Sequence, residues 1–185
     1  RDDDHFCGGY REYWDNVGGL GGDEGPIEIH FIDEVLPGYF WLFPVQGNRV
    51  NVGIGMLISE HRKLKKSRKK SLKKIQKWVI ENHPRFKNRF ANATLVPGSE
   101  KGWQLPFGSP RKNAPSFQPR RIAMAGAMCV GDSASLVDPF SGEGIGNALL
   151  SAKMTSKHFD RNIHAEGFTE ESAKEYMIDL WDALG

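Results

Sequence analysis

The sequence is poor in cysteine, with only Cys7 and Cys129 among 185 residues. Two cysteines provide no disulfide framework and fit a reducing compartment. The sequence also has no apolar run as long as a membrane-spanning helix and no signal peptide. Its six scattered histidines match no zinc-ligand spacing, and its serines lack the pattern of a hydrolase nucleophile. We therefore expect a cytoplasmic protein without a metal site.

A Gly-x-Gly-x-x-Gly turn, which holds the pyrophosphate in dinucleotide-binding folds, is also missing. The glycine-dense segment Gly18–Gly22 is followed by Asp-Glu-Gly-Pro, where no helix can start, so we interpret it as a flexible loop. The chain begins at Arg1 without an initiator methionine. We therefore expect an internal piece of a longer protein.

Positive charge is concentrated in one segment, although the net charge of the chain is only +2. Ten basic residues and no acidic residue lie in residues 62–77. A solvated helix face is one explanation. Peripheral contact with anionic lipid headgroups is another, since each basic residue near such a surface contributes about 1 kcal/mol. Nucleic-acid binding ranks last because no stacking aromatic residues interleave with the run.

Two apolar segments with a period of two predict a β-hairpin across residues 39–58. The segment Gln46–Asn48 has turn chemistry, and a three-residue loop sets Trp41 opposite Gly53 and Tyr39 opposite Gly55. Large rings opposite glycines leave a trough for an alkyl chain. Alternatively, the rings simply cover two weak strand positions.

A second glycine-rich segment follows the apolar stretch 121–130, which predicts a strand ending at Gly131 and Asp132. Glycines at alternate positions, 142, 144 and 146, precede a predicted helix over residues 143–160. Glycines let a ligand approach the backbone, and a helix N-terminus favours anionic groups. A tight strand-to-helix turn without a ligand is the alternative explanation.

The string GDSASLVDPFSGEGIGNALLSA, residues 131–152, resembles the second FAD-contacting motif of p-hydroxybenzoate-hydroxylase-like flavoproteins. The resemblance is strongest to the geranylgeranyl reductase family. It implies that Asp132 accepts a hydrogen bond from a ribityl hydroxyl and that Pro139 and Phe140 lie beside the flavin ring. The amides of residues 142–146 would face the N1/C2 edge of the ring. The implied FAD-binding residues are Gly131, Asp132, Pro139, Gly142, Gly144, Ile145 and Gly146.

The hairpin carries a second resemblance to the same family. Its string YFWLFP, residues 39–44, and the later Gly-Ile-Gly are similar to the Tyr-x-Trp-x-Phe-Pro and Gly-x-Gly pair of geranylgeranyl reductases. In that family the pair lines the cavity for an isoprenoid chain. The resemblance thus implies substrate contacts from Tyr39, Trp41, Phe43, Gly53 and Gly55.

The expected fold is α+β, a fragment of a two-domain flavoprotein. We predict an antiparallel substrate-binding sheet over residues 1–118, a strand–helix piece of a Rossmann-like FAD-binding domain over 119–160, and a C-terminal helix over 161–185. Within these domains we expect one helix over 59–82 and a buried Cys129.

The expected activity is FAD-dependent reduction of carbon–carbon double bonds in an isoprenoid chain, with NAD(P)H or ferredoxin as the electron donor. No side chain is identified as catalytic. A flavin monooxygenase or halogenase of the same fold is one alternative. The other is a fragment without independent activity, because this chain alone is expected to bind FAD weakly or not at all.

Overall fold

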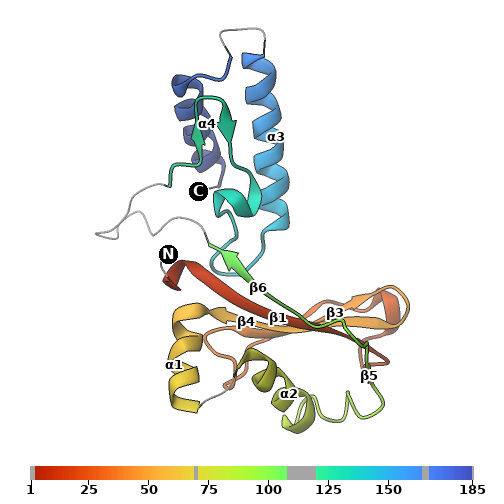
Figure 1. Ribbon diagram of the computed structural model, residues 1–185. Helices are drawn as coiled ribbons and strands as arrows, with labels where there is room; N and C mark the ends of the chain where they lie inside the picture. Colours follow the sequence, from red (N-terminus) through yellow and green to blue (C-terminus); the bar gives the residue numbers. More distant parts are fainter. Residues whose placement is uncertain (1–2, 69–70, 108–119, 164–166, 185) are drawn as a thin grey trace. The chain divides into compact units, whose positions relative to one another are not determined.

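The computed structural model describes residues 3–68, 71–107, 120–163 and 167–184 (Figure 1). The chain divides into two compact units, Arg1–Gln104 and Leu105–Gly185, and each is described by itself. The domain boundary expected at residues 118 and 119 lies outside the described residues. Helices and an antiparallel sheet together make the α+β fold that the sequence predicts.

The first unit is built on an antiparallel sheet with the order β2-β3-β4-β1-β5, and β6 also pairs with β1. A short 3-10 turn, Asp3–His5, precedes the sheet. The strands are β1 (Phe6–Asp15), β2 (Glu28–His30), β3 (Tyr39–Val45), β4 (Arg49–Leu57), β5 (Thr94–Leu95) and β6 (Lys101–Pro106).

The hairpin of β3 and β4 has the predicted register. Val45 pairs with Arg49 across a three-residue loop, so Trp41 lies opposite Gly53. Left-handed backbone angles at Gly47 and Asn48, with φ of 83° and 56°, close the turn. The register prediction is therefore confirmed.

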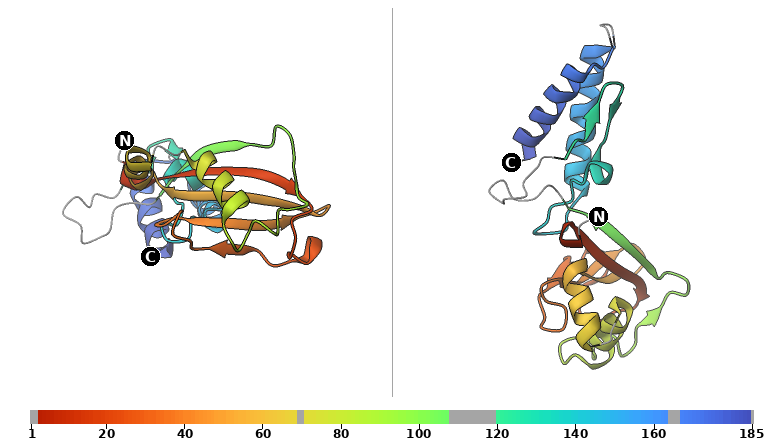
Figure 2. Two further views of the ribbon diagram at one scale, coloured as in Figure 1. Left: turned by 90° about the horizontal axis from the view of Figure 1, so that it is seen from below. Right: turned by 60° about the vertical axis from the view of Figure 1, so that its left-hand side comes forward.

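One face of this sheet forms the hydrophobic core of the unit. Helices α1 (Ile58–Arg68) and α2 (Leu72–Asn82) both lie on that side of the sheet (Figure 1 and Figure 2). The fully buried core side chains include Phe40, Leu42, Val52, Ile54, Val79 and Phe86. Because side chains alternate along a strand, the neighbouring residues of β3 and β4 project from the opposite face.

The prediction of a single helix over residues 59–82 is wrong, because two helices occupy this range. Ser71 begins the second one as its N-cap, and its side chain accepts a hydrogen bond from the Lys74 amide at 3.4 Å. Serine favours this position because its hydroxyl satisfies a free amide of the first turn.

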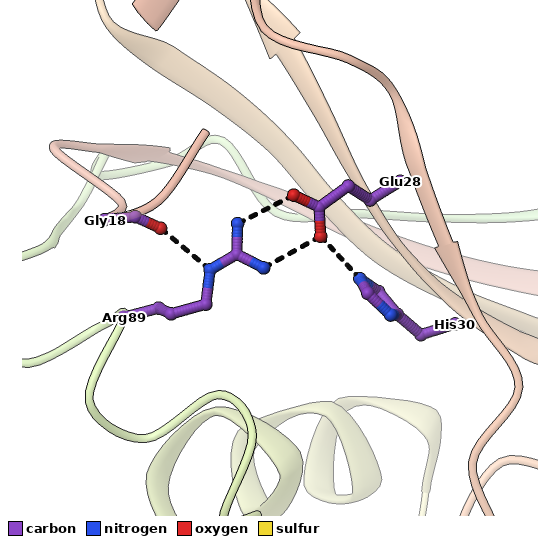
Figure 3. A network of polar contacts seen from close by, with 4 residues as sticks. All are labelled: Gly18, Glu28, His30 and Arg89. Atoms are coloured by element: carbon purple, nitrogen blue, oxygen red, sulfur yellow. Dashed lines mark hydrogen bonds and ion pairs between the residues drawn. The ribbon is translucent and has the colours of Figure 1, made fainter. Parts of the chain in front are cut away.

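The segment Gly18–Gly22 is anchored and is not the flexible loop that its composition suggests. Arg89 donates from Nε to the Gly18 carbonyl at 2.7 Å and makes two hydrogen bonds to Glu28 at 2.8 and 2.9 Å (Figure 3). His30 lies 2.7 Å from the same carboxylate. The hydrogen bonds from Arg89 lower the pKa of Glu28. Leu20, only 4% exposed, fixes the segment in the core.

The second unit pairs two helices with a small hairpin. Helices α3 (Ile145–Asn162) and α4 (Glu170–Leu184) pack side by side (Figure 2), and β7 (Ala123–Met124) pairs with β8 (Ala127–Met128). A 3-10 turn, η3 (Gly131–Ala134), leads toward α3. Tyr176 is buried in the core of this unit and donates a hydrogen bond to the Cys129 carbonyl at 2.9 Å.

The long strand expected over residues 121–130 is not present. Gly126, with φ of 77°, turns the chain back on itself, so the apolar stretch becomes the β7–β8 hairpin. Cys129 is exposed, which corrects the expectation that it is a core residue. Within the described ranges, no helix combines the length and apolar character needed to cross a membrane.

Candidate functional site

A row of aromatic rings follows β3 on the sheet face that points away from α1 and α2. The centroids of Tyr39 and Trp41 lie 5.9 Å apart, and those of Trp41 and Phe43 also lie 5.9 Å apart. Phe31 extends the row, with its ring centroid 6.2 Å from that of Tyr39. We call this face of the sheet the aromatic face. It offers partly exposed ring surface that matches an apolar ligand.

The ring of Trp41 lies directly over Gly53. A Cβ atom added at Gly53 would come within 2.2 Å of Trp41 Cζ2, a distance that no side chain tolerates. Trp41 Nε1 also donates to Asn51 Oδ1 at 3.1 Å, and the Phe43 ring stacks on Trp41 at an interplanar angle of 27°. Gly53 therefore provides the space in which the Trp41 ring packs against the strand. At this position the space expected for a ligand is filled.

The next position along β4 is different. A Cβ atom at Gly55 would make ordinary contacts, 3.4 Å from Cys7 Sγ and 3.6 Å from Trp41 Cζ3. Gly9 of β1 pairs with Gly55, and a Cβ atom there would meet only the Trp103 carbonyl oxygen, at 4.0 Å, among the described residues. Gly9 was not among the predicted site residues, although Cys7, Gly9 and Arg11 stand at alternate positions and so share one face of a strand.

Cys7 borders these two glycines from β1. Burial raises the pKa of its thiol to about 11, so the group stays protonated at neutral pH. A neutral thiol is a small apolar surface and a weak nucleophile.

In the second unit, η3 is fixed against α3. The Gly131 amide donates to Ser151 Oγ at 3.0 Å, and a Cβ atom at Gly131 would lie 3.1 Å from Ala148 Cβ. This close packing brings the exposed Asp132 to the beginning of α3. Its Oδ1 lies 3.5 Å from the position of a Cβ atom at Gly144, the N-cap residue.

The turn before α3 is held by Asp138. Its Oδ1 accepts from the Ser141 hydroxyl and amide, both at 2.6 Å, and from the Phe140 amide at 3.1 Å. The Ser141 hydroxyl is the first cause of the lowered pKa of Asp138. The turn presents Pro139 and Phe140 outward, and Phe140 is 92% exposed.

Several amides of this turn already have partners within the chain. The Gly142 amide donates to the Asp138 carbonyl at 2.9 Å, and the Gly146 amide donates to Glu143 Oε1 at 2.7 Å. Glu143 was not among the predicted site residues. Its carboxylate occupies the positive end of α3, where an anionic ligand edge was expected.

The structure thus gathers the predicted residues in two groups. Tyr39, Trp41, Phe43, Gly53 and Gly55 share the aromatic face of the first unit. Gly131, Asp132, Pro139, Gly142, Gly144, Ile145 and Gly146 lie in η3, the turn and the start of α3 in the second unit.

Solved structures share the fold of this chain. A geranylgeranyl bacteriochlorophyll reductase-like protein from Thermoplasma acidophilum matches all of this chain and 44% of its own, with a TM-score of 0.74 and 22% identity. The flavin-dependent brominase Bmp2 matches 97% of this chain and 40% of its own, with a TM-score of 0.66 and 16% identity. The fold is that of the FAD-dependent oxidoreductases and halogenases.

Sequence similarity identifies the family within this class. The model of the geranylgeranyl reductase catalytic domain matches residues 8–95. Digeranylgeranylglycerophospholipid reductase of Methanoculleus marisnigri is 30% identical over 163 residues, which are 87% of this chain and 35% of the relative. The enzyme of that name in Thermoplasma volcanium is 31% identical over 148 residues, 79% of this chain and 32% of the relative.

This chain belongs to the geranylgeranyl reductase family. It spans about a third of the length of the curated relatives that it matches.

Proposed function

We propose that the chain carries the prenyl-binding face and one part of the flavin site of an FAD-dependent reductase that acts on isoprenoid carbon–carbon double bonds. The aromatic face is the observation that carries this proposal. It combines stacked rings with neighbouring glycines, a surface suited to a long apolar chain.

The second unit fits part of FAD. An exposed carboxylate, Asp132, lies beside the beginning of α3, an 18-residue helix. Two apolar side chains in the first turns of this helix, Ile145 and Leu149, are 77% and 68% exposed. Asp132 would accept from a ribityl hydroxyl, while Pro139 and Ile145 would support the flavin ring. The Glu143 carboxylate must leave the Gly146 amide for the ring edge to bind there.

The bound flavin would supply the hydride, and the residues of this chain position the reactants. Trp41 and its neighbours hold the prenyl chain and exclude water from the double bond. The proton donor among the side chains stays unassigned. NAD(P)H or ferredoxin is the proposed source of electrons.

The names of the relatives support a substrate class. Both are named as reductases of digeranylgeranylglycerophospholipid, a lipid with prenyl chains on glycerol. We therefore extend the proposal to geranylgeranyl glycerophospholipids as substrates of the intact protein.

Because lipid substrates reside in membranes, we propose that the basic segment of α1 and α2 contacts a membrane surface. Among its described residues, Lys63, Lys73 and Lys77 form ion pairs with acidic neighbours at 2.6, 3.4 and 3.6 Å. These pairs reduce the attraction to an anionic surface. We therefore expect a weak, salt-sensitive contact.

The reaction can be tested in the intact, FAD-loaded protein. After anaerobic reduction of the flavin with dithionite, geranylgeranyl glycerophospholipid should reoxidise it, and mass spectrometry should show two hydrogen atoms added for each reduced double bond. A fully saturated lipid is the matched control and should leave the flavin reduced. Turnover only with oxygen and a halide would instead establish the halogenase alternative.

A further inference from the structure

We infer that the prenyl chain lies across the strands, in a shallow groove floored by Gly55 and Gly9, and that Gly53 makes no contact with it. This inference rests on the proposed function and adds to it the path of the chain and a specificity-determining residue, Gly9, on β1.

The register of three strands defines the groove. Tyr39, Gly55 and Gly9 lie in one row across β3, β4 and β1, because Tyr39 pairs with Gly55 and Gly55 pairs with Gly9. Two adjacent positions in this row have no side chain. With about 4.8 Å between neighbouring strands, the row is free of side chains over roughly two strand spacings, and its backbone is half-buried at Gly9 and buried at Gly55.

Larger side chains stand on both sides of this row. On one side lies the row of Trp41, Gly53 and Arg11, in which the Trp41 ring covers Gly53. On the other side Leu57 pairs with Cys7, whose Sγ lies 3.4 Å from the position of a Cβ atom at Gly55. Side chains that alternate along a strand place these residues on the same face as the glycines.

Arg11 leaves the groove clear of charge. Its guanidinium lies 4.4 Å from the ring centroid of Tyr13, and its Nη1 donates to the Ser99 carbonyl at 2.8 Å. Tyr13 follows Arg11 on the same face, in the direction away from Gly9. The surfaces that border the groove are therefore an indole ring, a leucine, a neutral thiol and glycine backbone, which suit a methyl-branched polyene and no charged ligand.

Two substitutions on neighbouring residues of β1 separate this inference from a general effect on folding. Gly9→Val places an isopropyl group in the groove, where the nearest atom to the new Cβ, 4.0 Å away, leaves room for it. Gly8→Ala is the matched control, because its Cβ would point to the core face, 3.4 Å from Leu72 Cδ1. Gly9→Ala serves as a smaller replacement if the valine variant is less stable than the wild type.

Cys7 reports on occupancy and the exposed Cys129 is the internal reference. In the 185-residue chain, the rate of N-ethylmaleimide addition at each cysteine is followed by peptide mass spectrometry, with and without geranylgeraniol. Direct binding of radiolabelled geranylgeraniol is measured in parallel. Geranylgeraniol should protect Cys7 and not Cys129 in the wild type and in Gly8→Ala. Gly9→Val should bind it about tenfold more weakly, which corresponds to lost burial of about two methylene groups.

The possible failures are distinguishable. If Gly9→Val binds geranylgeraniol as the wild type does, the groove is wrong, while the proposed function stands. If the wild type does not bind geranylgeraniol at all, both the inference and the proposed function are overturned. Wild-type binding that leaves Cys7 unprotected contradicts the path past Gly55 and Gly9.

Discussion

Both predicted binding sites of this protein contain glycines. At both sites a side chain of the protein occupies space that the sequence suggested for a ligand. On β4 the Trp41 ring covers Gly53. At the start of α3 the Glu143 carboxylate accepts from the Gly146 amide. The difference lies in how firmly each group is held.

Trp41 is fixed by three contacts, because it packs on Gly53, stacks with Phe43 and donates to Asn51. Glu143 is an exposed side chain with one hydrogen bond to the helix. A rigid ring is part of the binding surface, whereas an exposed carboxylate can be displaced. A glycine in a predicted site can therefore make room either for a neighbouring side chain or for a ligand.

The largest effect is expected for Gly53→Ala. Its Cβ would lie 2.2 Å from the Trp41 ring, so the ring must move. We expect the free energy of unfolding to fall by about 3 kcal/mol, at the upper end of the range for overpacking, when measured by urea denaturation. Gly8→Ala is the control and should change it much less. Full stability of Gly53→Ala would show that Trp41 is not held in place.

Asp132→Ala tests the proposed flavin site and should weaken the binding of FAD. Loss of an acceptor for the ribityl hydroxyl weakens binding by about 1–3 kcal/mol, or roughly 5- to 150-fold in the dissociation constant. Fluorescence titration of the intact protein with FAD measures this change. Asp160→Ala, at the far end of α3, provides the matched control. Equal affinity of the Asp132 and Asp160 variants would remove Asp132 from the flavin site.

Asn51→Ala tests how much a hydrogen bond adds to the placement of Trp41. The indole loses its acceptor while the stacking with Phe43 and the packing on Gly53 remain. The expected loss of stability is about 1 kcal/mol, with a shift in tryptophan emission that reports a changed environment of the ring. A loss as large as that for Gly53→Ala would mean that the hydrogen bond, and not the glycine, fixes the ring.

Glu143→Ala is expected to have the smallest effect and the opposite sign on ligand binding. Removing a carboxylate from the helix N-terminus costs a little helix stability but frees the Gly146 amide. FAD affinity should rise by up to about fivefold, since such charge interactions amount to 0.3–1 kcal/mol. Thermal denaturation and FAD titration of the same variant check both changes. Weaker FAD binding would instead make Glu143 a ligand-binding residue.

The sequence predicted the hairpin well because its signal is local. Alternation over residues 39–58 and a Gly-Asn turn determine the register without reference to the rest of the chain. It could not decide between a trough and a covered glycine at Gly53, because the rotamer of Trp41 depends on Asn51 and Phe43. Gly9 was not predicted either, since its partner Gly55 lies 46 residues further along the chain.

Longer-range contacts also explain the errors. The segment Gly18–Gly22 has the composition of a flexible loop, but Arg89, far along the chain, anchors it. Residues 121–130 have the composition of a buried strand, but Gly126 adopts a turn and its amide donates to the Phe168 carbonyl at 2.8 Å. In both cases a distant partner, absent from the local pattern, determines the structure.

Intermolecular nuclear Overhauser effects between ¹³C-labelled geranylgeraniol and this chain test the central claim most directly. The account predicts contacts from prenyl methyl groups to the Hα atoms of Gly9 and Gly55 and to the rim of the Trp41 ring. The Hα atoms of Gly53 should show contacts to the Trp41 ring and none to the prenyl chain. Prenyl contacts to Gly53, or none to the aromatic face, would contradict the account.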